Sequence, residues 1–227
     1  MGQEERIQNA YRGLGGKRTF YDGMITCSTL LGRAVCSLVW EMGRAETQDY
    51  FCAALSGIPE GFSGRLLEVP VGTGILTMPL YREMPEAEIT CLDYSPEMLE
   101  RAKSRGEGLA HVRFQQGDVG TLPFTDGAFD IVLSLNGFHA FQDKEAAYRE
   151  VFRVLKPGGT FCGCFYVAGE CKRTDWFIRH IYEKTGFFTP PYETTASMKK
   201  WLKKRYATVT LGTVKSMAWF ACRKGLR

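Results

Sequence analysis

The stretch that decides the fold is RLLEVPVGTG, residues 65–74, which ILTMPLYREM follows directly at residues 75–84. Its first half is the short apolar run of a buried strand, and its second half holds two closely spaced glycines, Gly72 and Gly74. The segment after them has the apolar spacing of a helix. A glycine-rich turn between a strand and a helix lets the backbone run close to a ligand, with helix N–H groups directed at it. The stretch therefore predicts a ligand-binding strand–turn–helix unit.

Downstream, short apolar runs alternate with amphipathic stretches, which is typical of β/α units around a parallel sheet. Two of the amphipathic stretches have candidate N-caps: Ser95 in SPEMLERAKSR and Asp143 in DKEAAYREVFRVL. The strands that we expect are residues 65–71, 88–93, 111–116, 128–135 and 160–167. After the fifth strand, we expect helices over residues 173–186 and 196–206.

The chain ends with ATVTLG (207–212) and VKSMAWFAC (214–222), which we expect to form an antiparallel hairpin at the sheet edge, with Gly212 between the two strands. The prediction is an α/β fold: a doubly wound, seven-stranded sheet of five parallel strands plus this hairpin. A (β/α)₈ barrel would need about 250 residues and eight repeats. Residues 1–62 have a helical pattern. We therefore expect a helical cap or lid over 1–62 and a core over 63–227, within one compact domain overall.

The composition of the 227 residues, 44% hydrophobic and 24% charged, excludes a disordered, fibrous or small disulfide-rich protein. The net charge of +4 is lower than a nucleic-acid-binding surface requires. The basic cluster at residues 199–205 is typical of a solvated helix face. No apolar run approaches the roughly 20 residues that cross a bilayer. The segment MGQEERIQNAY lacks the apolar stretch of a secretion signal, so we expect a cytoplasmic protein.

The eight cysteines are scattered, mostly within apolar segments, which favours buried reduced thiols over disulfides. Cys162 and Cys164 stand two residues apart in GTFCGCFYV, so a strand would direct both side chains to one face. Core packing is our interpretation of this pair, and a metal or metalloid thiolate site is the alternative. We include no metal among the expected cofactors.

Two details distinguish between possible ligands of the glycine-rich turn. A dinucleotide-binding turn that starts at Gly72 needs glycine at position 77, where this chain has Thr77. Asp93 ends the second strand, where a carboxylate can bind both ribose hydroxyls, and Asp118 follows the third strand, where it can meet an adenine amine. Glu68 is placed to hold an ammonium group or a water molecule. Together these residues describe a ligand with a ribose, an adenine and an ammonium group, without phosphate.

The order ExPxGTG (68–74), CLDYSPEML (91–99), GDVGTLPFTDGAFDIV (117–132) and REVFRVLKPGG (149–159) resembles the class I S-adenosylmethionine (SAM)-dependent methyltransferases. The resemblance covers residues 65–166 and implies a Rossmann-like fold, SAM as cofactor and S-adenosylhomocysteine (SAH) as product. Where the family usually has glycine this chain has Pro70, which requires an extended backbone that needs no N–H donor. The cofactor-binding residues that the resemblance implies are Tyr21, Glu68, Val71, Gly72, Thr73, Gly74, Asp93, Tyr94, Met98, Asp118, Val119 and Asn136.

The segment YDGMITCSTLLGRAVCSLVW (21–40) resembles, more weakly, the beginning of the ubiquinone/menaquinone C-methyltransferases. The matching positions are Tyr21, Asp22, Met24 and Trp40. This resemblance favours a small, apolar or aromatic acceptor. The substrate pocket that we expect is formed by Met24, Phe138, His139 and Phe141. His139 follows the fourth strand, where ligands bind in open α/β sheets, and it is our candidate general base; the alternative is a structural histidine.

The sequence thus predicts an enzyme that transfers the SAM methyl group to a small-molecule acceptor by in-line displacement. One alternative is a SAM-binding protein without turnover. Another is an RNA or protein methyltransferase that uses the basic helix at 199–205, although nucleic acid is not an expected partner. Thr77 and Asp118 argue against a nicotinamide oxidoreductase. The acceptor atom and the oligomeric state, monomer or homodimer, stay open.

Overall fold

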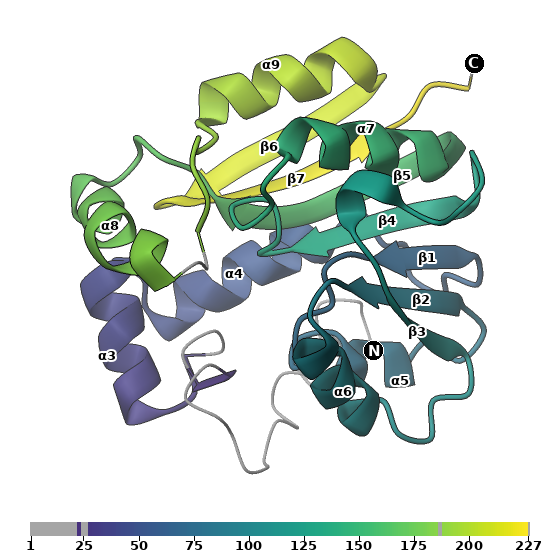
Figure 1. Ribbon diagram of the computed structural model, residues 1–227, viewed down its shortest axis with the longest axis horizontal. Helices are drawn as coiled ribbons and strands as arrows, with labels where there is room; N and C mark the ends of the chain where they lie inside the picture. Colours follow the sequence, from purple (N-terminus) through teal and green to yellow (C-terminus); the bar gives the residue numbers. More distant parts are fainter. Residues whose placement is uncertain (1–21, 24–26, 186–187, 227) are drawn as a thin grey trace.

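The computed structural model describes residues 22–23, 27–185 and 188–226, and its centre is a seven-stranded sheet in the order β3-β2-β1-β4-β5-β7-β6 (Figure 1). The strands are β1 (Arg65–Glu68), β2 (Glu88–Asp93), β3 (Val112–Gln116), β4 (Phe129–Leu135), β5 (Leu155–Tyr166), β6 (Thr208–Val214) and β7 (Met217–Arg223). Strands β1 to β5 pair in parallel, and β7 pairs antiparallel with both β5 and β6. The predicted doubly wound sheet with a terminal hairpin is confirmed.

Helices cover both faces of this sheet (Figure 1). The described helices are α3 (Leu30–Val39), α4 (Arg44–Leu55), α5 (Met78–Arg82), α6 (Pro96–Arg105), α7 (Lys144–Val154), α8 (Lys172–Phe177) and α9 (Thr195–Arg205). Short turns of 3₁₀-helix lie at Val119–Thr121 and Glu183–Thr185, and a π-helical turn lies at Ile178–Tyr182. Helices α4, α5 and α6 share one core layer, and α7 and α9 share the other.

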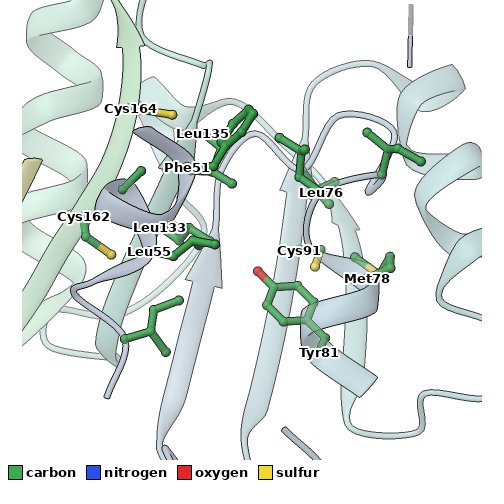
Figure 2. Packing of buried hydrophobic residues seen from close by; sticks show 14 of the residues in the cluster. Phe51, Leu55, Leu76, Met78, Tyr81, Cys91, Leu133, Leu135, Cys162 and Cys164 are labelled. Carbon is green, nitrogen blue, oxygen red and sulfur yellow. The ribbon is translucent and has the colours of Figure 1, made fainter. Parts of the chain in front are cut away.

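Alternation along the strands divides the core between these layers. In β1, Leu66 joins the core beneath α4 to α6, whereas Leu67 joins the core beneath α7 and α9. Ile131 and Val132 of β4 divide in the same way, because successive side chains of a strand point to opposite faces. Figure 2 shows the first layer from close by, with Phe51 and other α4 side chains against the residues of the central strands.

Helix boundaries follow the capping residues that the sequence offers. Ser95 accepts a hydrogen bond from the Met98 N–H at 3.3 Å, and Asp143 accepts one from the Ala146 N–H at 2.8 Å. Both side chains satisfy N–H groups that the first turn of a helix leaves without a partner. The two predicted N-caps are therefore observed, with α6 and α7 directly behind them.

Several predicted boundaries were wrong. Strand β1 ends at Glu68 rather than at residue 71, and β5 begins at Leu155 rather than at residue 160. The helix after the glycine-rich turn begins at Met78 rather than at residue 75, because Pro79 favours the first helical turn. Gly212 lies inside β6, and the chain turns at residues 215–216 instead. A side chain at position 212 would collide with the indole of Trp219, its partner on β7, so glycine is needed there for packing. The helix expected over 173–186 is divided into α8 and two short irregular turns.

The segment before the first strand contains α3 and α4. Helix α4 packs against β5 and β7, and Arg173 of α8 bonds to the Ser37 carbonyl of α3 at 2.9 Å. Cys27 and Cys36 form a disulfide, which corrects our expectation of reduced thiols for this pair. The turn before α3 brings the two Cα atoms to 6.3 Å, within bridging range. The spacing of the two cysteines in the sequence does not show this approach. Cys91, Cys162, Cys164 and Cys222 are buried thiols, as expected.

Candidate active site

A cavity of about 990 Å³ opens at the carboxyl ends of β1, β2, β3 and β4. Strand β1 lies between β2 and β4, so the strand order reverses here, which is where open α/β sheets bind ligands. The volume is at the upper end of the roughly 300–1,000 Å³ typical of ligand pockets. The predicted site residues that line the cavity are Gly72, Asp93, Tyr94, Met98, Asp118, Val119, Asn136, His139 and Phe141.

The glycine-rich loop forms part of the cavity wall. Gly72 and Gly74 have positive φ values of 57° and 68°, which favour glycine. A Cβ at Gly72 would meet no atom within 4 Å, so the loop leaves open space on its cavity side. A Cβ at Gly74 would come within 2.9 Å of Met78 and 3.3 Å of the Ala102 backbone, so this glycine permits close packing against α6. The loop is thus shaped to let a ligand approach its backbone.

Pro70 lies in the same wall, with its neighbours anchoring the loop to adjacent strands. The Val69 N–H donates to the Leu133 carbonyl at 2.9 Å, and the Val71 N–H donates to the Leu92 carbonyl at 3.0 Å. The loop therefore needs no donor at position 70, as the sequence led us to expect. The Val69–Pro70 peptide bond is cis.

Asp93 connects the end of β2 to the glycine-rich loop. One carboxylate oxygen accepts the Gly72 N–H at 2.8 Å, and the other accepts the Ser95 N–H at 2.9 Å. Burial raises the pKa of Asp93, while the backbone N–H groups of Ser95, Gly72 and Tyr94 lower it. A carboxylate has about four acceptor positions, so Asp93 keeps capacity for hydroxyl groups in the cavity.

Asp118 stands at the opposite end of the polar wall, after β3. Its carboxylate accepts the Gly120 N–H at 2.8 Å as the cap of a short 3₁₀ turn, and its side chain is exposed. Beside it, Val119 is buried and Met98 half-buried, while Tyr94 is 75% exposed. We call Gly72, Asp93, Asp118, Met98 and Val119 the cofactor side of the cavity.

Several predicted cofactor residues lie behind this wall instead of in it. Val71, Thr73 and Gly74 belong to the loop but do not line the cavity. Glu68 shares the orientation of Leu66 along β1, so its side chain points into the core, where it accepts the Tyr81 hydroxyl at 2.8 Å. Burial raises the pKa of Glu68 to about 8. The proposed role of Glu68 toward an ammonium group stays a prediction.

The remaining wall is largely aromatic. Phe188 is buried at its centre, with ring centroids 4.2 Å from His139, 5.7 Å from Tyr182 and 6.1 Å from Trp40. We call these residues, together with Phe141, the aromatic side. Sequence reasoning missed Tyr182 and Phe188, because aromatic residues outside a motif cannot be told from core residues by pattern alone. Other lining residues that it missed are Met42, Thr47, Tyr50, Ile181 and Met217.

His139 is held as a neutral ring within the aromatic side. Burial, assisted by the Lys144 ammonium, lowers the pKa of His139 to about 3. Its Nδ1 accepts the Tyr166 N–H at 3.4 Å, which assigns the proton of the neutral ring to Nε2. A general base needs an unprotonated nitrogen facing the substrate and a pKa near the working pH. The geometry therefore favours a hydrogen-bond donor or wall residue over the predicted base.

The loop that carries His139 is fixed by contacts with the segment around Thr189. Lys144 donates to the Phe141 carbonyl at 2.9 Å and to the Thr189 carbonyl at 2.7 Å. The Thr189 N–H donates to the His139 carbonyl at 2.9 Å, and its hydroxyl donates to the Ala140 carbonyl at 3.0 Å. Three of these hydrogen bonds join the two segments of the aromatic side, and the fourth, from Lys144 to Phe141, lies within the His139 loop.

Two further predictions have clear structural outcomes. Phe138 does not line the cavity: it is fully buried beneath α7, with its ring 4.3 Å from that of Tyr148, because the turn after β4 directs it into the core. Asn136 lines the cavity with a positive φ of 55°, and its N–H donates to the Cys164 carbonyl at 2.7 Å. Tyr21 and Met24 lie outside the described residues.

The cofactor side fits the SAM that the sequence resemblance implies. Asp93 offers acceptors for hydroxyl groups beside an open glycine cradle, and Asp118 offers an acceptor about one strand spacing further along. In the described part of the chain, no three histidine, cysteine, aspartate or glutamate side chains are grouped to hold a metal ion. No helix among the described residues is long and apolar enough to cross a membrane.

Comparison with known proteins agrees with this reading of the site. Residues 66–159 match the family model of a methyltransferase domain. The demethylmenaquinone methyltransferase of Thermus thermophilus is 45% identical over 97 residues, 42% of this chain and 44% of that protein. The ubiquinone/menaquinone biosynthesis C-methyltransferase UbiE of Desulfotalea psychrophila is 36% identical over 148 residues, 65% of this chain and 58% of that protein. The chain thus spans about half the length of these curated relatives.

A solved structure shows the same fold at greater coverage. It is a SAM-dependent methyltransferase of Thermotoga maritima, described as a possible histamine N-methyltransferase, with a TM-score of 0.62 and 20% identity. The match covers 89% of this chain and 99% of that one. At this identity the likeness concerns the fold alone, whereas the family model and the curated relatives concern the sequence motifs. Residues 66–159 thus match a methyltransferase domain, within a fold that this chain shares with a SAM-dependent methyltransferase.

Proposed function

We propose that this protein transfers the methyl group of SAM to a small aromatic acceptor of the quinol type. The observation that carries the proposal is the aromatic side, which lines the same cavity as Asp93 and Gly72. Rings such as Trp40, Tyr182 and Phe188 suit an apolar, planar acceptor, because aromatic pairs add attraction beyond the burial of their area. The curated relatives that are named for quinone methylation support the same acceptor class.

When bound, SAM supplies an electrophilic methyl carbon on a sulfonium. The chain would contribute position and exclusion of water, which are the principal requirements of an in-line displacement. Asp93 would hold the ribose hydroxyls and the glycine-rich loop the methionine end. On the aromatic side, the Nε2–H of His139 is available as a hydrogen-bond donor for an acceptor oxygen, since Nδ1 already accepts the Tyr166 N–H.

The basic helix does not favour the alternative of a macromolecular substrate. Lys199, Lys200, Lys203 and Lys204 are exposed on α9, but no residue of α9 is among those that line the cavity. Arg205 stacks over Trp201 with its guanidinium carbon 4.1 Å from the ring centroid. An RNA or protein substrate bound on α9 would therefore not bring its reacting atom to the cavity without a further contact surface.

The proposal is tested by incubating the protein with methyl-labelled SAM and a panel of substituted hydroquinones, phenols, amines and thiols, with mass spectrometry of the products. We expect ring-methylated product from the hydroquinones. An Asp93→Ala variant serves as the control for transfer that depends on the cavity. Methylation confined to amines or thiols would refute the acceptor class, and binding of SAH without transfer to any member would favour a protein without turnover.

A further inference from the structure

A buried carboxylate from the N-terminal segment reaches the glycine-rich loop. Asp22 is fully buried, although it precedes the loop by some fifty positions in the chain. One of its oxygens accepts the Thr73 hydroxyl at 2.8 Å, and the other accepts the Arg105 guanidinium at 2.6 Å. Asp22 belongs to the segment 21–40 that resembles the beginning of the quinone methyltransferases.

Arg105 completes a closed set of contacts around Thr73. It occupies the last turn of α6, and its second terminal nitrogen donates to the Thr73 carbonyl. Thr73 is thus held twice, at its side chain by Asp22 and at its backbone by Arg105, while the two holding groups are paired with each other. Charged groups on both sides make these hydrogen bonds stronger than neutral ones.

Backbone hydrogen bonds add to these contacts: the Gly74 N–H donates to the Val71 carbonyl at 3.1 Å, and the Met78 N–H donates to the Gly74 carbonyl at 3.0 Å. Thr73 stands between Gly72 and Gly74, both with positive φ and without side chains to pack. On the other side, Asp93 holds the Gly72 N–H. The loop is therefore clamped between Asp93 of β2 and the Asp22–Arg105 pair, with its open face toward the cavity.

A purely structural role would not require this chemistry. Burying a carboxylate with a guanidinium costs desolvation, and well-packed apolar residues often hold two segments together equally well. The charged groups fix the orientation of Thr73, because Asp22 binds its hydroxyl and Arg105 binds its carbonyl. Thr73 itself does not line the cavity, so any effect on a ligand would pass through the backbone of the loop.

We propose that Asp22, through Thr73 and Arg105, positions the glycine-rich loop for the methionine end of SAM. Asp22 is thus a positioning residue, which couples docking of the N-terminal segment to cofactor affinity. This inference rests on the proposed function, since it assumes that the cavity binds SAM. The contacts of Asp22 and Arg105 with Thr73 should therefore affect the affinity for ligands that carry the amino-acid part, and should not affect the affinity for the nucleoside alone.

The test measures binding of two ligands, SAH and adenosine, to the full chain by titration calorimetry. Thr73→Val removes the hydroxyl at nearly constant shape, and Thr73→Ser retains it. Asp22→Ala and Arg105→Ala remove the charged partners. Arg101→Ala is the matched control, because Arg101 lies on the same helix in an exposed pair with Glu97 at 2.7 Å.

We expect Asp22→Ala, Arg105→Ala and Thr73→Val each to weaken SAH binding by roughly 5- to 20-fold, less than the direct loss of a charge-assisted hydrogen bond to the ligand, because the effect passes through the backbone of the loop. Adenosine binding should be unchanged, Thr73→Ser and Arg101→Ala should bind SAH as the wild type does, and the Asp22→Ala/Thr73→Val double variant should lose less than the sum of its parts. If Asp22→Ala fails to fold, the Thr73→Ser and Thr73→Val pair decides.

Two results would overturn the inference while leaving the proposed function intact. Unchanged SAH affinity in folded Thr73→Val and Asp22→Ala would show that the loop does not depend on the clamp. If the variants bound SAH and adenosine more weakly by the same factor and also had a lower melting temperature, the contacts of Asp22 would have a general structural role. A wild-type protein that binds neither ligand would refute the proposed function, and this inference with it.

Discussion

On the cofactor side of the cavity, polar groups from the ends of neighbouring strands face the open space, whereas the aromatic side is built from rings that come from distant parts of the chain. Asp93 and Asp118 each follow directly after a strand, and their positions are set by the register of the sheet. Trp40, His139 and Phe188 instead follow a helix, a strand and a 3₁₀ turn.

The two sides also differ in what holds them. On the cofactor side, Asp93 binds the backbone N–H groups of Gly72 and Ser95, so sheet and loop are joined by charge-assisted hydrogen bonds. On the aromatic side, ring packing around Phe188 adds to the hydrogen bonds that Lys144 and Thr189 make between the His139 loop and the segment around Thr189. The difference predicts that substitutions on the first side change ligand affinity, while those on the second change stability and acceptor use together.

The largest effect is expected for Phe188→Ala. Its buried ring contacts Trp40, His139, Tyr166 and Tyr182, so truncation leaves a cavity and should lower the free energy of unfolding by about 3–5 kcal/mol. Denaturant unfolding measures this loss. In the folded variant, the KM for the acceptor should rise while SAH affinity stays near the wild-type value.

A matched comparison is Phe220→Ala, a buried ring beneath α9 that lies outside the cavity. It should lose a similar amount of stability without a change in the acceptor KM. If Phe188→Ala weakened SAH binding and left the acceptor KM unaltered, the division of the cavity into two sides would be wrong.

Asp93→Ala tests the cofactor side. Loss of its charge-assisted hydrogen bonds should weaken SAM and SAH binding by about 1.5–3 kcal/mol, roughly 10- to 150-fold. Calorimetry with SAH measures the change, and Asp126→Ala, an exposed carboxylate outside the cavity, is the control. Asp118→Ala should cost less, because Asp118 is exposed and meets one amine rather than two hydroxyls. Wild-type affinity in Asp93→Ala would refute the ribose assignment.

The part of the site that sequence could predict is the part tied to strand ends. The bounds of β2, residues 88–93, were predicted correctly, and this placed Asp93 at the rim of the sheet. Ser95 and Asp143 were identified as caps because each is a short polar residue directly before an amphipathic run. Local chemistry of this kind is complete within a few residues.

The errors arose where a role depends on contacts between distant residues. Phe138 was assigned to the pocket beside Phe141, but its place on the turn after β4 directs its side chain into the core. The Glu68 side chain was expected to face the ligand, whereas the alternation of β1 directs it to the Tyr81 hydroxyl; its role toward an ammonium group stays a prediction. The Cys27–Cys36 disulfide likewise depends on the path of the chain before α3. A single sequence contains no local signal for the orientation of Phe138 or for the disulfide, whereas the alternation of β1 does indicate the direction of Glu68.

Two titratable groups, Glu68 in the core behind the cofactor side and His139 on the aromatic side, should give the free energy of unfolding opposite pH dependences. Burial raises the pKa of Glu68 from 4.5 to about 8, so the folded state binds the proton more tightly, and the contribution of Glu68 to the free energy of unfolding falls as pH rises across this range. The pKa of His139 falls from 6.5 to about 3, so the unfolded state binds more protons, and its contribution rises with pH over that range.

Glu68→Gln and His139→Gln separate these contributions. Relative to the wild type, Glu68→Gln should gain stability as pH rises from 4.5 to 8, and His139→Gln should gain stability as pH falls from 6.5 toward 3. Denaturant unfolding at the ends of each range measures both. A difference between variant and wild type that does not change with pH would show that the group titrates normally in the folded protein.

The smallest effect is expected for the methyl-transfer rate of His139→Gln, and it decides what the aromatic side does. A general base contributes about 10²–10⁴-fold, and its loss is partly rescued at high pH. A ring that is neutral above about pH 3, with Nδ1 already accepting the Tyr166 N–H, has no free basic nitrogen for an acceptor. Glutamine retains an N–H donor, so kcat should stay within about tenfold of the wild type, without an inflection near the ordinary histidine pKa. His139→Ala should lose more, because it also removes the ring stacked on Phe188 at 4.2 Å. A hundredfold loss in the glutamine variant that hydroxide restores would instead make His139 the base, and the aromatic side would then take part in the chemistry as well as in holding the acceptor.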